Sequence, residues 1–478
     1  MQLIQNGFSC EYEMNVFMKM FFSKEDEGNV LTDFSYEDGV INANVKVYYK
    51  GKEYEGSYRF PYEKRNERTD KIVFRCFVVR AFLKACEDIK KVSVPWGALS
   101  GIRPAKVVRQ MKESGMDWDE IYNELDEIFG VSDEKKKLAI SVAKKEGEIL
   151  KDIKENSASI YIGIPFCPSK CLYCSFVSSD LRTGKKYVDD YVKLLDKEIE
   201  KTADILKKLG FSIENIYIGG GTPTSVNEEQ LKIILDSVNR HIDLSNVKEF
   251  TLEAGRADTI TKEKLLIAKN AGVDRISINP QSMRDETLIR VGRKHTAKMV
   301  KEAFSLAREC GFDNINMDLI AGLPGERFED FKYSLDEVIK LDPENVTVHS
   351  LCIKRAAGFR FSEYSLADSE EMDKMLGYTQ KRMYETSRNP YYMYRQKNIS
   401  GNLENVGYAK EGYHSFYNIN IMEEVQNIIA VGGGGVSKLV KGDRIERIFN
   451  FKDPCEYIRR FDEIIDKKDE FYKIYNEM

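Results

Sequence analysis

The stretch that decides the fold is Tyr161-Ile-Gly-Ile-Pro-Phe-Cys-Pro-Ser-Lys-Cys-Leu-Tyr-Cys-Ser-Phe176. It places Cys167, Cys171 and Cys174 in a C-x3-C-x2-C array directly after a short apolar run, which predicts a buried strand followed by a loop. Three cysteines on one loop can bind three irons of a 4Fe-4S cluster, which usually has four cysteine ligands. One iron would then be open to a small molecule such as S-adenosylmethionine (SAM), which one electron from the cluster could cleave to a 5′-deoxyadenosyl radical.

Two other kinds of site are compatible with three close cysteines, namely a zinc site and a redox-active thiol patch. Zinc in structural sites has four ligands. The four histidines, His241, His295, His349 and His414, all lie far along the chain, and no fourth cysteine is near in sequence. The spacing therefore favours an iron–sulfur cluster over zinc.

The composition narrows the class of protein. The chain has 478 residues, 42% of them hydrophobic, which predicts two or three domains. A net charge of -5 argues against a general nucleic-acid-binding protein. Nine cysteines without a recognisable signal peptide favour a reducing compartment, and no apolar run approaches the roughly 20 residues that span a bilayer. We expect a cytoplasmic protein without a membrane span.

Residues 1–155 predict a separate α+β domain with a helical connector. Alternating residues on both sides of Lys50-Gly51-Lys52 predict a hairpin over 45–58, and apolar spacing predicts a helix from about Asp70 to Lys90. The expected role of this domain is to pack on the catalytic domain or to bind a partner.

From residue 159 short apolar runs alternate with amphipathic stretches, which predicts parallel strands joined by helices. The runs lie at 161–164, 216–218, 250–252, 275–278, 315–319 and 346–351, and the helical stretches at 184–209, 226–240, 261–271, 296–311 and 327–340. We therefore predict an α/β fold, an open six-stranded parallel βα barrel over 156–365, followed by a C-terminal extension over 366–478.

Polar or glycine residues follow these runs, where the loops of such barrels form the active face. They are Gly219-Gly-Gly-Thr-Pro-Thr224, Glu253, Gln281, Asp318 and the pair His349-Ser350. Bare glycine backbone lets a ligand approach closely and offers amide donors. The sequence thus predicts one site at the carboxyl ends of the strands.

Several other segments allow two interpretations. Arg293-Lys-His295, and Lys354-Arg355 after the sixth run, are either solvated basic groups or ligands for carboxylates. Aromatic residues with Arg395 and Lys397 in the segment 391–398 suit a flat, carboxylate-bearing substrate, or else form a packed edge. The apolar run at 428–431 enters four glycines, as expected where backbone passes close to a ligand or another strand.

Together these motifs resemble the radical SAM family that contains oxygen-independent coproporphyrinogen III oxidase, also called coproporphyrinogen dehydrogenase. The resemblance covers about 159–440, and the N-terminal domain and the segment 391–398 are similar to its HemZ-type branch. It rests on Tyr161-x-x-Ile-Pro-Phe-Cys, the cysteine loop, the Gly219 to Thr224 loop, Glu253, Ile276-Ser-Ile-x-x-Gln-Ser282, Arg293-x-His295, Asp318-Leu-Ile-x-Gly-Leu-Pro-Gly325 and the late glycine loop.

The resemblance implies a 4Fe-4S cluster on Cys167, Cys171 and Cys174 and one or two molecules of SAM. The residues implied to contact the cluster-bound SAM are Tyr161, Gly220, Glu253 and Val436. Those implied for a second SAM are Tyr173, Gly221, Thr222, Gln281, Arg293 and Asp318.

The implied reaction is oxidative decarboxylation of two propionates of coproporphyrinogen III to give protoporphyrinogen IX in heme biosynthesis. The implied partners are a tetrapyrrole substrate and a flavodoxin- or ferredoxin-like electron donor, and the candidate ligands for substrate carboxylates are Lys354, Arg355, Arg395 and Lys397. Two positions depart from the pattern. Gly163 stands where many relatives have His, and Ser175-Phe176 replaces the Gly-Cys pair of the best-defined oxidases. The second change is typical of heme-chaperone relatives, so a heme-binding chaperone without decarboxylase activity is the alternative.

Overall fold

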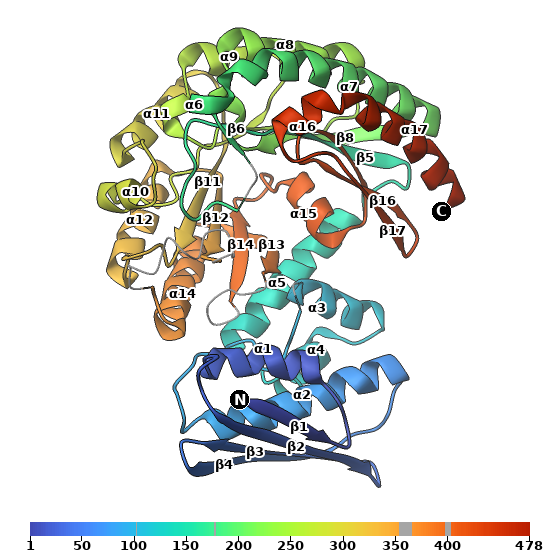
Figure 1. The fold of residues 1–478 in the computed structure, drawn as a ribbon, viewed down its shortest axis with the longest axis vertical. Coiled ribbons are helices and arrows are strands. Elements are labelled where there is room, and N and C mark those ends of the chain that lie inside the picture. Colours follow the sequence, from blue (N-terminus) through green and yellow to red (C-terminus); the bar gives the residue numbers. More distant parts are fainter. Residues whose placement is uncertain (102, 176–177, 353–365, 397–402) are drawn as a thin grey trace. The chain divides into compact units, whose positions relative to one another are not determined.

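The computed structural model describes residues 1–478 apart from 102, 176–177, 353–365 and 397–402 (Figure 1). The chain forms two compact units. The first comprises Met1–Lys144, Asp368–Gly377 and Tyr394–Glu404, and the second comprises Lys145–Ala367, Tyr378–Met393 and Asn405–Met478.

The first unit contains a four-stranded sheet in the order β1 (Gln2–Asn6), β2 (Gly28–Glu37), β3 (Val40–Tyr49) and β4 (Lys52–Pro61). The predicted hairpin is confirmed, since β3 and β4 pair antiparallel with Tyr49 opposite Lys52. The predicted helix is α2 (Glu67–Cys86), which begins where the Asn66 side chain accepts a hydrogen bond from the Thr69 amide. Further helices are α1 (Glu11–Phe21), α3 (Pro104–Glu113), α4 (Trp118–Glu127) and α5 (Asp133–Leu150).

The second unit is built on a large, mostly parallel sheet, and its centre confirms the six predicted strands. They are adjacent and parallel in chain order: β5 (Ser157–Ile164), β8 (Ser212–Gly220), β9 (Glu249–Glu253), β10 (Arg275–Ser277), β11 (Asn314–Ala321) and β12 (Asn345–Ser350). Their side chains are almost all buried, as expected for parallel strands covered by crossover helices.

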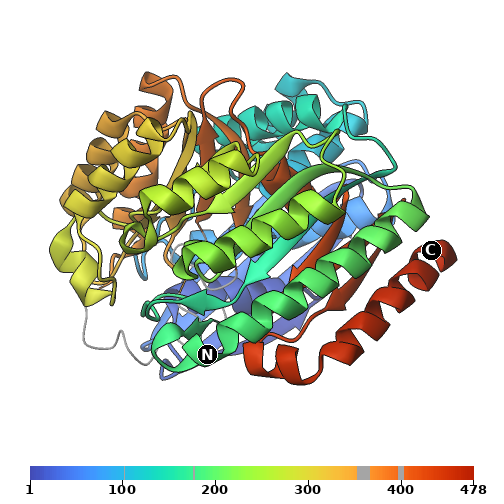
Figure 2. The same cartoon turned by 90° about the horizontal axis from the view of Figure 1, so that it is seen from above.

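Helices cover the outer face of this curved sheet (Figures 1 and 2). The predicted stretches correspond to α7 (Val188–Leu209), α8 (Glu228–His241), α9 (Lys262–Asn270), α11 (Ala297–Glu309) and α12 (Phe328–Leu341). Capping side chains fix where they begin: Asn227 with Gln230 forms a capping box, and Thr261 and Thr296 accept from the first turns of α9 and α11. These three caps place the starts of α8, α9 and α11 after the loops that follow β8, β9 and β10.

The sheet is wider than the sequence indicated, because the C-terminal region adds strands on both sides. β15 (Asn427–Gly432) lies parallel beside β5, followed by β16 (Val436–Lys441) and β17 (Arg444–Phe449). On the other side β14 (Glu404–Ala409) pairs antiparallel with β12, and β13 (Asn389–Arg395) is outermost. The chain ends in α16 (Pro454–Arg459) and α17 (Phe461–Glu477).

Among the residues that the structure describes, no helix has the length and apolar character needed to cross a lipid bilayer.

Candidate metal and cofactor site

The three cysteines lie on one loop after β5. Cys167 ends the short strand β6 (Phe166–Cys167), and the amide of Cys174 donates to the carbonyl oxygen of Cys171 at 3.2 Å. Cys167 and Cys171 are buried and Cys174 is half-buried. The Leu172 amide donates to the Val291 carbonyl at 3.0 Å, which fixes the loop against the segment that follows α10 (Asp285–Arg290).

The described part of the chain holds no three His, Cys, Asp or Glu side chains that converge as the ligands of a single metal ion would. Thiolates that bind different irons of one cluster have no need to converge on a point. The donor set, three cysteines on a single anchored loop, therefore fits a cubane cluster.

The glycine loop after β8 packs directly on the first cysteine. The amide of Gly221 donates to the Ile164 carbonyl and that of Thr222 to the Phe166 carbonyl, both at 2.8 Å. The Thr222 hydroxyl lies 3.4 Å from Cys167 Sγ. A Cβ on Gly221 would lie 2.5 Å from the Phe166 carbonyl oxygen and 3.0 Å from Cys167 Sγ. Only glycine therefore allows the two loops to approach this closely.

Glu253, at the end of β9, accepts a hydrogen bond from the Tyr217 hydroxyl. The rings of Tyr161, Tyr217 and Tyr417 form a cluster, with centroids 6.2 Å apart for Tyr161 and Tyr217, 4.5 Å for Tyr217 and Tyr417, and 6.4 Å for Tyr161 and Tyr417. Strands β5 and β8 and helix α15 (Phe416–Glu423) therefore all contribute to the surroundings of Glu253. Burial raises the pKa of Glu253 to about 7, and the nearby Asp318 carboxylate adds to the shift. Glu253 and Tyr161 were predicted from the sequence, whereas Tyr217 and Tyr417 were not.

Gln281 and Asp318 meet at the next two strand ends. The Gln281 amide donates to the Asp318 carbonyl at 2.8 Å, and Gln281 adopts a left-handed backbone with φ 67°. The Gln281 Oε1 atom is buried without a hydrogen-bond partner among the described residues, as expected of a group that receives a ligand. Burial would raise the pKa of Asp318, but neighbouring His349, Asn316 and Arg275 lower it, so this carboxylate is ionised.

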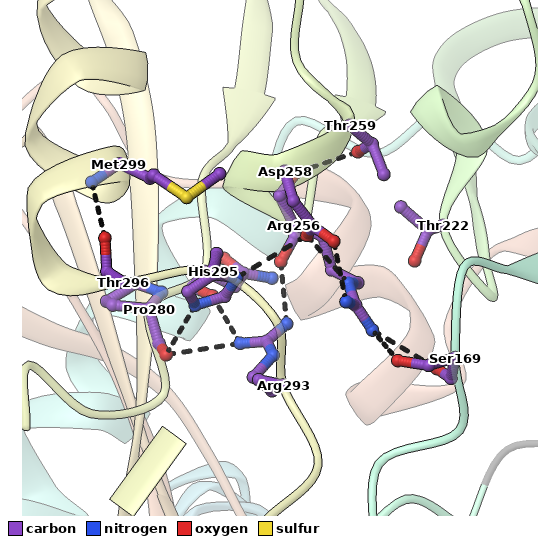
Figure 3. A network of polar contacts seen from close by, with 12 residues as sticks. Ser169, Thr222, Arg256, Asp258, Thr259, Pro280, Arg293, His295, Thr296 and Met299 are labelled. Atoms are coloured by element: carbon purple, nitrogen blue, oxygen red, sulfur yellow. Dashed lines mark hydrogen bonds and ion pairs between the residues drawn. The ribbon is translucent and has the colours of Figure 1, made fainter. Parts of the chain in front are cut away.

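Arg293 and His295 belong to a buried polar network (Figure 3). The interpretation of this segment as a solvated basic cluster is therefore wrong. Arg293 Nη1 donates to the Asn279 carbonyl at 2.6 Å, and Nη2 donates to the Gly255 carbonyl at 2.9 Å. His295 Nδ1 lies 3.7 Å from Asp258 Oδ1, and burial lowers the pKa of His295, so the imidazole is neutral at pH 7.

Arg256 and Asp258, which sequence reasoning missed, complete this network. Arg256 Nε and Nη2 donate to the two carboxylate oxygens of Asp258, at 3.0 and 2.8 Å. Burial would raise the pKa of Asp258, but His295 and Arg256 hold it well below its usual value. The sequence feature that could have identified them is an Arg and an Asp two residues apart, directly after the end of the third predicted strand.

The remaining predicted residues lie in several places. Tyr173 packs against Val291, Ile320, Leu323 and Leu351, and Val436 begins β16 after the late glycine turn. Arg395 is 2% exposed, and its Nη1 donates to the Leu99 carbonyl at 2.7 Å within the first unit. Its role as a carboxylate ligand stays a prediction. Lys354, Arg355 and Lys397 lie outside the described residues.

The tyrosine-rich segment forms the edge strand β13, in which Tyr391 and Tyr392 are buried. Tyr392 packs over Gly407 of the neighbouring strand, where an added Cβ would lie 1.8 Å from the Tyr392 ring. Of the two interpretations of this segment, the structure therefore supports the packed edge for these two rings.

The pKa of Glu253 gives a testable pH dependence. Because the folded protein retains this proton between the ordinary pKa of 4.5 and about 7, the stability that the proton provides is present below pH 4.5 and is lost as the pH rises to 7. At one pKa unit per 1.36 kcal/mol, the loss is up to about 3 kcal/mol.

We expect urea denaturation at pH 5, 6 and 7, without cofactors, to show a steeper fall in the wild type than in Glu253→Gln. A smaller fall remains in the variant, because burial also raises the pKa of Glu326 to about 7 and that of Asp274 to about 6. Parallel pH slopes for the two proteins would contradict the raised pKa.

The sequence matches a protein-family model and is similar to several known proteins. The model of the radical SAM superfamily matches residues 161–338. The oxygen-independent coproporphyrinogen-III oxidase-like protein HemZ of Bacillus subtilis is 42% identical over 384 residues, covering 79% of this chain and 77% of the relative. The heme chaperone HemW of the same organism is 36% identical over 271 residues, covering 56% and 68%.

Among solved structures, the coproporphyrinogen III oxidase HemN from Escherichia coli, described as a radical SAM enzyme, is similar in fold. Its TM-score is 0.53 at 22% identity, and the match covers 67% of this chain and 72% of that one. At this identity the match concerns the fold alone, which is the predicted radical SAM barrel.

Proposed function

The chain belongs to the radical SAM superfamily, in the family of the oxygen-independent coproporphyrinogen-III oxidase-like proteins, and on this premise we propose that it decarboxylates coproporphyrinogen III without oxygen. In this reaction two propionate side chains become the vinyl groups of protoporphyrinogen IX. Each propionate loses a hydrogen atom, carbon dioxide and one electron, which passes to an acceptor.

The observation that carries the proposal is the anchored three-cysteine loop, which packs against the glycine loop. The Thr222 hydroxyl of the glycine loop lies 3.4 Å from Cys167 Sγ. Cys167, Cys171 and Cys174 would hold a 4Fe-4S cluster and leave one iron open. When bound, the cluster and SAM supply one-electron cleavage of a sulfonium and hydrogen-atom abstraction. We propose that the electron comes from a flavodoxin- or ferredoxin-like protein in the cytoplasm.

The residues around the loop would bind and orient the cofactor. In the proposed arrangement Glu253 accepts hydrogen bonds from the SAM amino group, and a bound cation would favour its ionised form. We propose that the backbone of Gly220 lies against the ligand and that Tyr161 shields it from water, while Gly221 packs on Phe166 and Cys167. The ionised Asp318 carboxylate and the Gln281 Oε1 atom, which has no hydrogen-bond partner among the described residues, would contact a second SAM.

An anaerobic assay tests the proposal. The protein is reconstituted with iron and sulfide and incubated with SAM, a reductant and coproporphyrinogen III, and the products are identified by mass spectrometry. We expect tetrapyrrole that has lost two carboxyl groups, together with 5′-deoxyadenosine. Formation of 5′-deoxyadenosine without any vinyl product would reject this substrate.

A second candidate is a heme chaperone. It is favoured by Ser175-Phe176 in place of the Gly-Cys pair and by the relatives named heme chaperone. It predicts stoichiometric heme binding, measured by titration of the Soret band, and no conversion of coproporphyrinogen III. Turnover in the same preparation would exclude it as the main function.

A further inference from the structure

Arg256 is a buried cation that connects the cysteine loop to the sheet. It is 2% exposed and lies three residues after Glu253, in the loop that follows β9. Its Nη1 donates to both the hydroxyl and the carbonyl oxygen of Ser169, at 2.9 and 3.2 Å. Ser169 lies between Cys167 and Cys171, so this one guanidinium holds the middle of the ligand-bearing segment (Figure 3).

Asp258 fixes the orientation of Arg256. The carboxylate accepts from Nε and Nη2, so Nη1 is left to face the cysteine loop. Such a bidentate pair holds the planar guanidinium more rigidly than a single contact could. Asp258 is in turn 3.7 Å from His295 and is thus part of the buried network rather than an exposed side chain.

The charges of this network do not cancel. Arg256 and Arg293 contribute two positive charges, Asp258 contributes one negative charge and His295 is neutral, which leaves one net positive charge. Burial opposes the charge of Arg256, but the ion pair with Asp258 raises its pKa, and a guanidinium remains a cation in proteins. A net positive charge that contacts the loop between Cys167 and Cys171 suits an anionic thiolate assembly.

We propose that Arg256 is a positioning residue for the cluster: it fixes the loop between Cys167 and Cys171 and places a permanent positive charge beside the bound iron–sulfur group. This inference rests on the proposed cluster but not on any substrate. Because reduction adds one negative charge to a cluster, a fixed neighbouring cation stabilises the reduced form and raises the reduction potential.

The test uses Arg256→Gln, which removes the charge and the ion pair, and Arg256→Lys, which keeps a charge but lacks the planar fork that pairs with both oxygens of Asp258. Arg240→Gln is the matched control, because Arg240 is an exposed residue of α8 that forms an ion pair with Asp196 of α7. Each protein is reconstituted anaerobically, its cluster is titrated by EPR at set potentials, and the rate of iron removal by a chelator is followed.

For Arg256→Gln we expect the reduced-to-oxidised ratio at a fixed potential to fall about tenfold, which is 59 mV for a one-electron couple, and iron to be lost faster. Arg256→Lys should lose iron faster with a smaller shift in potential. If Arg256→Gln and Arg240→Gln have the same reduction potential and the same rate of iron loss, the inference about Arg256 is wrong, although the proposed cluster is unaffected.

Two further outcomes are decisive. A wild-type protein that assembles no cluster would overturn the proposed function and this inference with it. If Arg256→Gln does not fold, the test depends on Arg256→Lys. A rate of iron loss from Arg256→Lys equal to that of the wild type would overturn the positioning role.

Discussion

Serine in place of Cys171 is expected to abolish cluster binding and all formation of 5′-deoxyadenosine. The thiolate is the iron ligand, and a serine hydroxyl stays protonated near neutral pH. Cys171 is 9% exposed, and its carbonyl oxygen accepts from the Cys174 amide, a bond that serine leaves in place. The substitution therefore removes one ligand and leaves the backbone of the loop unchanged.

The measurement is the iron and sulfide content after anaerobic reconstitution, together with the visible absorption of the cluster. Cys455→Ser is the control, since Cys455 lies in α16 and its amide contact with Asp453 does not involve the thiol. The control should bind as much iron as the wild type. A brown Cys171→Ser protein with full iron content would show that the loop does not hold the cluster.

The six central strands could be predicted because each is a short apolar run between amphipathic stretches. The polar groups at the strand ends could be predicted for a related reason, since the carboxyl ends of parallel strands share one edge. Glu253, Gln281 and Asp318 indeed lie on β9, after β10 and on β11. Local pattern alone was sufficient for these residues.

Contacts between distant segments could not be predicted in this way. Ser169 and Arg256 are 87 residues apart, and neither belongs to a periodic pattern. The run at 428–431 indicated a close approach to a ligand or a strand, but not that β15 would lie beside β5. The late glycines also explain Gly163, because a Cβ there would lie 2.8 Å from the Gly433 carbonyl oxygen, which leaves no room for a side chain unless the backbone moves.

The largest expected loss of stability comes from Glu198→Ala. Glu198 lies on α7 and is fully buried, and it forms an ion pair of 3.1 Å with Lys468, which is itself buried. It also accepts hydrogen bonds from the Gly432 amide, the Asn450 side chain and the Tyr457 hydroxyl, at 2.8, 2.7 and 2.6 Å. Alanine would leave the Lys468 charge buried without its carboxylate, which costs about 3–5 kcal/mol.

Urea denaturation of Glu198→Ala, of Lys468→Met and of the Glu198→Ala/Lys468→Met double variant measures this effect. The double variant should lose less stability than the sum of the two single ones, because it leaves no buried charge uncompensated. Asp236→Ala, which breaks the exposed pair with Lys232, should barely change the midpoint. A loss below about 1 kcal/mol for Glu198→Ala would contradict a buried ion pair.

Glu198→Ala should also weaken the anchoring of the cysteine loop. Gly432 pairs with Gly163 in the register of β15 and β5, and β5 leads directly into the loop. The Tyr191 hydroxyl reinforces this junction, since it donates to the Gly163 carbonyl at 2.6 Å and accepts from the Gly433 amide at 2.7 Å. We therefore expect Glu198→Ala to lose iron to a chelator faster than Asp236→Ala, although Glu198 contacts none of the three cysteines in the structure.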